Sequence, residues 1–210
     1  MRRKHVVITG TGRAGTTFLV QLLTNLGLDT GHDKASVNAL IHPHAKAGLE
    51  RNILQDNIPY IVKDPWFCDI VDGVLARPDI EVCHVYIPMR NLYAAAESRR
   101  RVTRETLAAL SADERKITPP HLVPGGLWHT DKPEQQESIL LMQLYKLLLS
   151  LSKTDIPVTL LHYPRITSDA PYLYAKLKSI LGTIELAIFA RVYAKTVRPD
   201  WVSQFGSDDR

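Results

Sequence analysis

V-V-I-T-G-T-G-R-A-G-T-T, residues 6–17, has the pattern of a buried strand that enters a glycine-rich turn, with a helix beginning directly after it. Gly10, Gly12 and Gly15 allow backbone conformations that a Cβ would oppose, so the loop can wrap closely around an anion. Backbone N–H groups at the start of a helix are unpaired and lie at its positive end, which makes them natural phosphate ligands. We therefore expect a phosphate-binding loop here.

The spacing of the first and last of these glycines fits the nucleotide-phosphate loop G-x-x-x-x-G-K-[ST], except that Thr16 replaces the lysine. The nearest cation is Arg13, inside the loop. ATPases and GTPases use that lysine, together with a carboxylate at the end of a second strand that holds Mg²⁺. Here the strand-like run 81–88 leads to Arg90 and not to a carboxylate. These departures favour a donor that a metal need not bridge.

The size and composition of the chain are typical of one globular domain, which we predict over residues 1–210. Its 45% hydrophobic and 23% charged residues are ordinary proportions, and the net charge of +4 suits a protein that handles a polyanionic small molecule. The sequence has no basic stripe interleaved with aromatic residues, the pattern that is typical of proteins that bind single-stranded nucleic acid. The apolar runs are too short for a signal peptide or a transmembrane segment, and two cysteines give no disulfide framework. We therefore expect a cytoplasmic protein with reduced thiols.

Strand-like runs alternate with helical runs, which is the pattern of an α/β domain. Apolar runs rich in Val, Ile or Leu, typical of strands covered on both faces, lie at residues 5–9, 60–63, 81–87 and 157–162. Helical runs lie at residues 15–26, within 34–55, and at 66–76, 92–110, 134–150 and 170–181. We predict a three-layer, P-loop-containing nucleotide-binding fold with a central, mostly parallel sheet of about five strands.

Residues 111–132 form a polar stretch that contains three prolines and two glycines. Such a composition predicts neither regular helix nor strand, and long loops in compact domains are often lids. We interpret this stretch as a mobile cover over the substrate side, an interpretation that Trp128 and His129 favour. A disordered surface excursion is the alternative.

Ligands of open α/β sheets bind beyond the carboxyl ends of the strands, so the residues at those ends are the candidate site. The first strand leads to Arg13, the second to Lys63-Asp64-Pro65, the third to Arg90 and the last to His162-Tyr163. Cations at three of the four strand ends repel one another unless an anion binds among them. For Arg100, Arg101 and Arg104, further along the third segment, surface charge is the simpler interpretation.

Together these motifs resemble the sulfotransferases that use 3′-phosphoadenosine 5′-phosphosulfate, in particular their bacterial members, which have a P-loop fold. The first family motif, [K/R]-[S/G]-G-T-T before an apolar helix, is similar to residues 13–17, R-A-G-T-T. The second, an arginine that ends a strand with a serine eight residues on, matches Arg90 and Ser98. A lysine-containing strand end between the two, often K-D-P, is similar to residues 63–65. A Y-E-D-L stretch before a helix that closes in L-G is similar to residues 163–182.

The chain departs from the family pattern at three places. Ala14 stands where the family usually has Ser or Gly, and Pro164-Arg165 replaces a Glu-Asp pair. The terminal basic loop that closes over the nucleotide in many members has Arg191, Lys195 and Arg198 as its candidate counterparts.

The resemblance implies a role for each matching residue. The cofactor-binding residues would be Gly12, Arg13, Ala14, Gly15, Thr16, Thr17, Arg90, Ser98 and Tyr163, with the 5′-phosphosulfate on the loop, the 3′-phosphate on Arg90 and Ser98, and the adenine near Tyr163. Arg13 and Lys63 would stabilise the leaving phosphate without a metal ion.

In-line transfer also needs a base that faces the sulfur. The candidates are His32 and Asp33 first, then Asp64, with His42 and His44 as further options.

The leading hypothesis is therefore a sulfotransferase that moves a sulfuryl group from 3′-phosphoadenosine 5′-phosphosulfate to a hydroxyl or amine of an acceptor by metal-free in-line transfer, leaving adenosine 3′,5′-bisphosphate. The alternatives are a P-loop small-molecule kinase that uses ATP and Mg²⁺, or a non-catalytic protein that keeps the nucleotide fold for partner binding. The sequence leaves the acceptor and the oligomeric state open.

Overall fold

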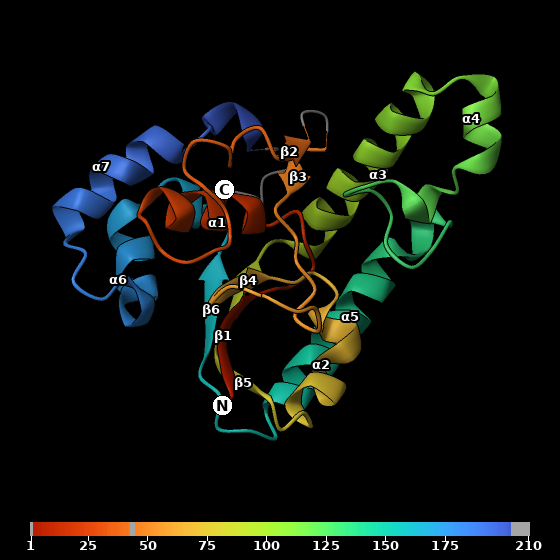
Figure 1. Ribbon diagram of the computed structural model, residues 1–210. Helices are drawn as coiled ribbons and strands as arrows, with labels where there is room; N and C mark the ends of the chain where they lie inside the picture. Colours follow the sequence, from red (N-terminus) through yellow and green to blue (C-terminus); the bar gives the residue numbers. More distant parts are fainter. Residues whose placement is uncertain (1, 43–44, 203–210) are drawn as a thin grey trace.

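A four-stranded parallel sheet forms the centre of the molecule in the computed structural model, which describes residues 2–42 and 45–202 (Figure 1). β1 (Arg3–Ile8) pairs with β4 (Ile61–Lys63) on one side and with β5 (Ile80–Met89) on the other, and β6 (Val158–His162) pairs with the outer side of β5. The fold is α/β as predicted, and each strand-like run forms a strand. The described sheet has four strands where about five were expected.

The register of the sheet brings the carboxyl ends of its strands to one edge. Ile8 pairs with Lys63 and with Tyr86, and Met89 pairs with His162. Because all four strands are parallel, the segments that follow them emerge at this same edge, where ligands bind in sheets of this kind.

One face of the sheet is covered by α1 (Thr16–Asn25), α6 (Ala170–Leu181) and α7 (Leu186–Thr196) (Figure 1). Alternate strand residues point to this face, and their side chains join one buried cluster with those of the helices, among them Val6, Ile8, Tyr86, Leu22, Leu177 and Phe189. The α7 helix was not predicted, although its buried residues Phe189 and Tyr193 follow the spacing of a helix that buries one stripe.

The opposite face is covered by α2 (Phe67–Leu75) and α5 (Gln136–Leu151). The strand residues on this face pack in a second cluster with these two helices, and include Val7, Val85 and Ile87 with Phe67, Leu147 and Leu151. α3 (Leu92–Ala109) begins at Asn91, whose side chain accepts a hydrogen bond from the Ala94 amide (3.1 Å), and packs on α5 through small residues. Ser98 and Arg99 are among the buried residues of α3.

Two predictions about local structure were wrong. The segment 34–55 contains no helix in its described part; β2 (Ile41–His42) and β3 (Ala47–Gly48) form an antiparallel hairpin there. Left-handed backbone at Lys46 and Leu49, with φ of 48° and 68°, is incompatible with a continuous helix.

The second error concerns the stretch 111–132, which holds α4 (Ala112–Ile117). Ser111 and Glu114 form a capping box at its start, a signal that the polar composition had concealed. Single-turn 3₁₀ helices span Pro120–Leu122, Pro133–Gln135, Arg165–Thr167 and Pro199–Trp201.

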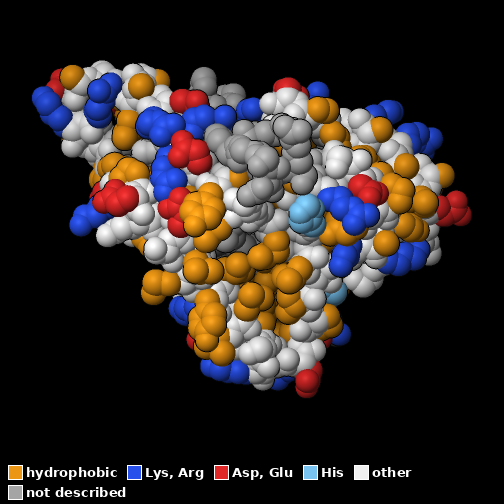
Figure 2. All heavy atoms as spheres, turned by 180° about the vertical axis from the view of Figure 1, so that it is seen from behind, with side chains coloured by type: hydrophobic (Ala, Val, Ile, Leu, Met, Phe, Trp, Pro, Cys, Tyr) orange, Lys and Arg blue, Asp and Glu red, His pale blue; other side chains and the backbone are white. Residues whose placement is uncertain are grey.

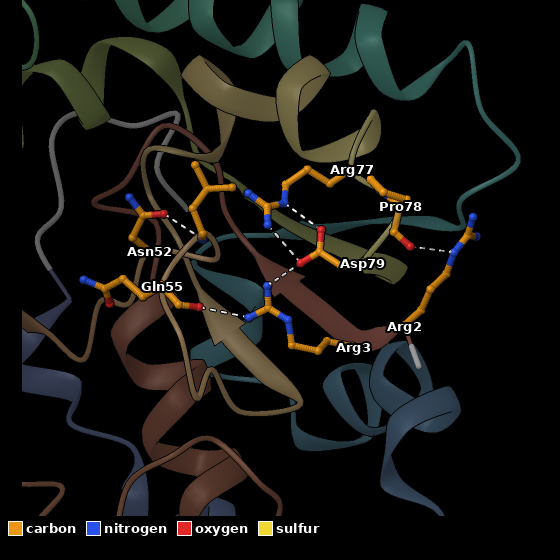
Figure 3. A network of polar contacts seen from close by, with 8 residues as sticks. Arg2, Arg3, Asn52, Gln55, Arg77, Pro78 and Asp79 are labelled. Carbon is orange, nitrogen blue, oxygen red and sulfur yellow. Dashed lines mark hydrogen bonds and ion pairs between the residues drawn. The ribbon is translucent and has the colours of Figure 1, made fainter.

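An ion-pair cluster ties the chain together at the edge of the sheet opposite to the carboxyl ends (Figure 3). Asp79, just before β5, accepts hydrogen bonds from Arg3 of β1 (2.8 Å) and from Nε of Arg77 (2.8 Å). These bonds from Arg77 and Arg3 hold the pKa of Asp79 well below its usual range. Arg3 also donates to the Gln55 carbonyl (3.0 Å), so the cluster joins β1 to two neighbouring segments.

None of the helices within residues 2–42 and 45–202 has the combined length and apolar character needed to cross a membrane.

The layer packing predicts unequal effects of two leucine truncations on the same side of the sheet. Leu177 of α6 is fully buried, whereas Leu186 of α7 is 42% exposed. Leu177→Ala should lower the free energy of unfolding by about 3 kcal/mol, because it leaves a cavity in the core. Leu186→Ala is the matched control and should lower it by less than about 1 kcal/mol. Urea unfolding measures both, and equal effects would contradict this packing.

Candidate functional site

The loop between β1 and α1 has the backbone of an anion-binding cradle. Gly12, Arg13 and Gly15 all have left-handed φ angles, of 67°, 56° and 86°, and Gly15 directly precedes the first turn of α1. Successive amides in such a turn point toward a common centre, and the positive end of the helix adds to the attraction for an anion. The glycines are required, since a Cβ on Gly12 would lie 2.4 Å from Nη2 of Arg99.

Arg13 and Arg90 meet at this loop although they follow different strands. Nε of Arg13 donates to the Ser98 hydroxyl of α3 (3.1 Å), and its Nη1 donates to the Ala45 carbonyl. Nη1 of Arg90 donates to the Arg13 carbonyl (3.1 Å), and its guanidinium lies 4.9 Å from the centre of the Tyr163 ring. The structure thus brings together Arg13, Arg90, Ser98 and Tyr163, which the sequence assigned to one site.

Arg99 is a third guanidinium in the same place, and it is 98% enclosed. It donates to the carbonyls of Thr11 (2.7 Å) and Gly126 (2.7 Å), and it lies 4.8 Å from the centre of the Trp128 ring. Burial, with Arg13 nearby, lowers the pKa of Arg99 to about 9. Burial, with Arg90 and Arg101 nearby, lowers the pKa of Arg13 to about 10. Both guanidinium groups stay charged at neutral pH, and their mutual repulsion makes the charged form of each less favourable.

Lys63 connects the loop to a carboxylate that the sequence analysis did not find. Its ammonium donates to the Thr17 hydroxyl (2.8 Å), the Gly48 carbonyl (2.7 Å) and the Glu50 carboxylate (2.7 Å). Burial lowers the pKa of Lys63, and Glu50 opposes that change. Burial also acts to raise the pKa of Glu50, but the ammonium of Lys63 outweighs it, and the pKa is lowered. Each member of the pair thus favours the ionised form of the other.

These groups line a cavity of about 730 Å³ at the carboxyl edge of the sheet. Its cationic lining residues are Arg13, Lys46, Lys63, Arg90, Arg99 and Arg198. Among the described residues that line it, Glu50 is the only one with a carboxylate. A volume of this size is typical of small-molecule sites, and the excess of positive charge favours an anionic ligand.

The stretch that we interpreted as a cover supplies one wall of the cavity, through residues 121–129. Gln136 of α5 accepts a hydrogen bond from the Trp128 amide (2.7 Å), which holds this ring close to Arg99. His129, with left-handed φ of 54°, contacts Asp69 of α2 through Nε2 (3.0 Å). The wall is thus attached to both helices on that face of the sheet.

Most of the predicted site residues line the cavity, and four do not. Those that do are Gly12, Arg13, Gly15, Thr16, Thr17, Lys63, Arg90, Ser98 and Tyr163. Ala14 is fully buried behind the loop, and His32 and Asp33 lie outside the cavity wall in the segment after α1. Asp64 is also fully buried, and its two carboxylate oxygens accept bonds from the amides of Ile53 (2.9 Å) and Trp66 (2.9 Å).

The further histidine and basic candidates divide in the same way. His42 lines the cavity, and its Nδ1 accepts a hydrogen bond from the Ala45 amide (3.1 Å). His44 lies outside the described residues. Of the three basic residues near the end of the chain, Arg198 lines the cavity and Arg191 and Lys195 do not.

Two functional candidates were missed, for different reasons. Glu50 lies in a segment without a recognisable motif, and only the hairpin fold brings it to Lys63. Arg99 did have a signal, because it directly follows Ser98, but the sequence analysis assigned it no role. Arg104, whose side chain is 65% exposed, pairs with Glu97 at 3.0 Å and is a surface charge as expected, whereas the side chain of Arg100 pairs with Glu137 and is only 18% exposed.

A scan against protein-family models finds no match, and a search of curated proteins also finds none. Within the described ranges, no group of three or more His, Cys, Asp or Glu side chains is placed to hold a metal ion.

The two carboxylates proposed as bases predict different outcomes on truncation. Asp64→Ala should lower the free energy of unfolding by about 2–4 kcal/mol, because two buried amides lose their acceptor. Asp33→Ala, at an exposed position, should change it by less than about 0.5 kcal/mol. Thermal or urea unfolding followed by circular dichroism measures both. If Asp64→Ala leaves the free energy of unfolding unchanged, the hydrogen bonds to the Asp64 carboxylate do not support the fold.

Proposed function

We propose that this protein is a sulfotransferase that takes a sulfuryl group from 3′-phosphoadenosine 5′-phosphosulfate and transfers it to a hydroxyl or amine of an acceptor. The observation that carries the proposal is the convergence of Arg13, Arg90 and Lys63 on the loop before α1. Each comes from a different strand end, and the resemblance in motif order assigns the same residues to the two ends of this donor.

The hydrogen-bond partners of the arginines support a role in donor binding. Arg13 and Arg99 donate to a serine hydroxyl and to backbone carbonyls, and these neutral partners do not cancel the charge of the two guanidinium groups. Repulsion between two unit charges a few ångströms apart is worth about 4 kcal/mol in a partly buried site. A polyanion bound among the cations replaces this repulsion with attraction. Arginine is also the residue best suited to planar, paired contacts with phosphate. The residues present therefore fit a nucleotide with two phosphate-bearing ends.

Glu50 is the group that we assign to proton removal, in place of the earlier candidates His32, Asp33 and Asp64, which do not line the cavity. The acceptor oxygen or nitrogen forms a bond to sulfur while the bond from sulfur to the 5′-phosphate oxygen breaks, and its electron pair stays with the phosphate. The acceptor proton passes to the Glu50 carboxylate. Lys63 and Arg13 stabilise the charge that develops on the departing phosphate, as fixed cations do in other transfer sites.

The kinase alternative is less well supported because of Thr17. In phosphate-loop kinases the Ser or Thr at this position of the motif holds Mg²⁺. Here the Thr17 hydroxyl accepts a hydrogen bond from the Lys63 ammonium (2.8 Å), so a protein cation already serves that oxygen. Metal-free transfer is the chemistry that this contact favours.

Nucleotide binding is the first test. Calorimetry should show that adenosine 3′,5′-bisphosphate binds without Mg²⁺ and more tightly than ATP with Mg²⁺. Arg90→Ala should weaken that binding by about 10- to 100-fold, because it removes a charge-assisted hydrogen bond to phosphate. Arg104→Ala, which removes an exposed arginine paired with Glu97, is the matched control and should leave it unchanged.

Tight Mg²⁺-dependent binding of ATP instead would favour the kinase, and no nucleotide binding would favour a non-catalytic role. Equal effects of the two arginine variants would place the 3′-phosphate elsewhere.

The assignment of Glu50 as the base predicts that its substitution lowers the rate of sulfuryl transfer but leaves the affinity for the donor nucleotide unchanged. With a labelled-sulfate donor and a panel of hydroxyl and amine acceptors, Glu50→Gln should lower the transfer rate by about 10²–10⁴-fold, because the variant cannot accept the proton. Its affinity for the bisphosphate nucleotide should stay within about threefold of wild type, a change of less than 1 kcal/mol. Glu134→Gln, at an exposed position, is the control and should keep the full rate.

The same assignment fixes the acid limb of the pH–rate profile. The carboxylate must be ionised to accept a proton, so the rate falls as pH drops through the pKa of Glu50. Because Lys63 lowers that pKa, the loss should begin only below the ordinary value of 4.5. An acid limb above pH 6 would show that a group other than Glu50 accepts the proton.

A further inference from the structure

The sheet face that α2 and α5 cover remains open beside its edge strand. Val85 and Ile87 of β5 point to this face, where they pack against α5. Val158 pairs with Val85 and Leu160 pairs with Ile87, and partners in a parallel ladder project from the same side of the sheet. Val158 and Leu160 are nevertheless 37% and 46% exposed.

α5 continues this apolar surface toward solvent. Its residues Leu141, Met142, Tyr145 and Leu149 are between 45% and 70% exposed. With 3.6 residues per turn, Leu141 lies about 140° around the helix from Lys146, which donates to the Asp69 carbonyl of α2, whereas Met142 and Leu149 are neighbours of Lys146 at the rim of this surface. The flank that carries Leu141 therefore faces the side of β6.

We call the six residues Leu141, Met142, Tyr145, Leu149, Val158 and Leu160 the α5–β6 face. No charged residue is among them. Figure 2, which shows the side opposite to the view of Figure 1, has a continuous group of hydrophobic side chains in its lower half, with charged side chains around its rim. An apolar centre inside a polar rim is the usual anatomy of a protein interface, and patches of this size on soluble proteins mark association sites.

We propose that the α5–β6 face binds a second copy of this chain across a two-fold axis. In such an interface each residue meets the same surface on its partner, so a charged stripe would oppose itself and an uncharged one does not. From their exposed fractions, and about 200 Å² for a large side chain, the six residues offer roughly 600 Å² per copy. A stable interface buries about 800 Å² per partner, of which somewhat more than half is apolar, so this face alone supplies that share.

The mass of the protein in solution tests the proposal. Sedimentation equilibrium over a range of concentrations should give twice the 23.6 kDa of one chain for the wild type. Met142→Glu, at a position that is 70% exposed, should return the mass to that of one chain, because each copy would bury a carboxylate in an apolar interface. Ile117→Glu is the matched control: it places the same charge on α4 at a position that is 80% exposed, and it should leave the dimer intact.

Tyr145→Glu, at a position that is 66% exposed, provides a second variant, and circular dichroism checks that each variant folds. Binding of adenosine 3′,5′-bisphosphate should be the same in these variants as in wild type, since none of the changed residues lines the cavity. A wild type that keeps the mass of one chain overturns the proposal, as does a dimer that survives both face variants. Co-purification of the wild type in a fixed ratio with a different protein would assign the face to that partner instead.

Discussion

The gathering of several buried cations around one helix start is the constraint on which the site depends. Arg13, Arg90 and Arg99 lie at the loop before α1 with Lys63 beside them, and Glu50 is the one carboxylate among the described residues that line the cavity. Enclosing like charges is unfavourable, and here backbone carbonyls and the Trp128 ring offset part of that cost. The parallel sheet makes the arrangement possible, since it directs every strand end to the same edge. An anion is the ligand that this arrangement stabilises most.

The loop and the arginine behind it depend on each other. The Arg99 guanidinium occupies the space into which a Cβ on Gly12 would project, and it donates to the carbonyl of Thr11. These contacts, together with the bond from Arg90 to the Arg13 carbonyl, give two carbonyls of the loop arginine donors. A lysine at position 16, as in ordinary phosphate loops, would add a further charge to a site where Lys63 already reaches Thr17. The departure of this loop from the common motif is therefore consistent with the rest of the cluster.

The parts that sequence could predict are those encoded over short distances. The strand runs, the glycine loop and the residues at the strand ends follow from local pattern, and the structure places Arg13, Arg90, Ser98 and Lys63 together as the pattern implied. Glu50 could not be found this way, because it lies in irregular backbone within a segment that was predicted to contain a helix, and its partner Lys63 is 13 residues further on in β4. His32, Asp33 and Asp64 looked suitable by residue type alone. For Asp64, the hydrogen bonds that occupy both oxygens became visible only with the chain folded.

α5 links the cavity to the exposed apolar face. At its first turn, Gln136 is fully buried and accepts a hydrogen bond from the Trp128 amide, which fixes the wall of the cavity next to Arg99. One turn later the exposed stripe begins at Leu141. If a second copy binds along this stripe, α5 has less freedom to move, and Gln136 at its start is restrained with it. Association through α5 would thus make the cavity wall more rigid without contributing any residue to the site.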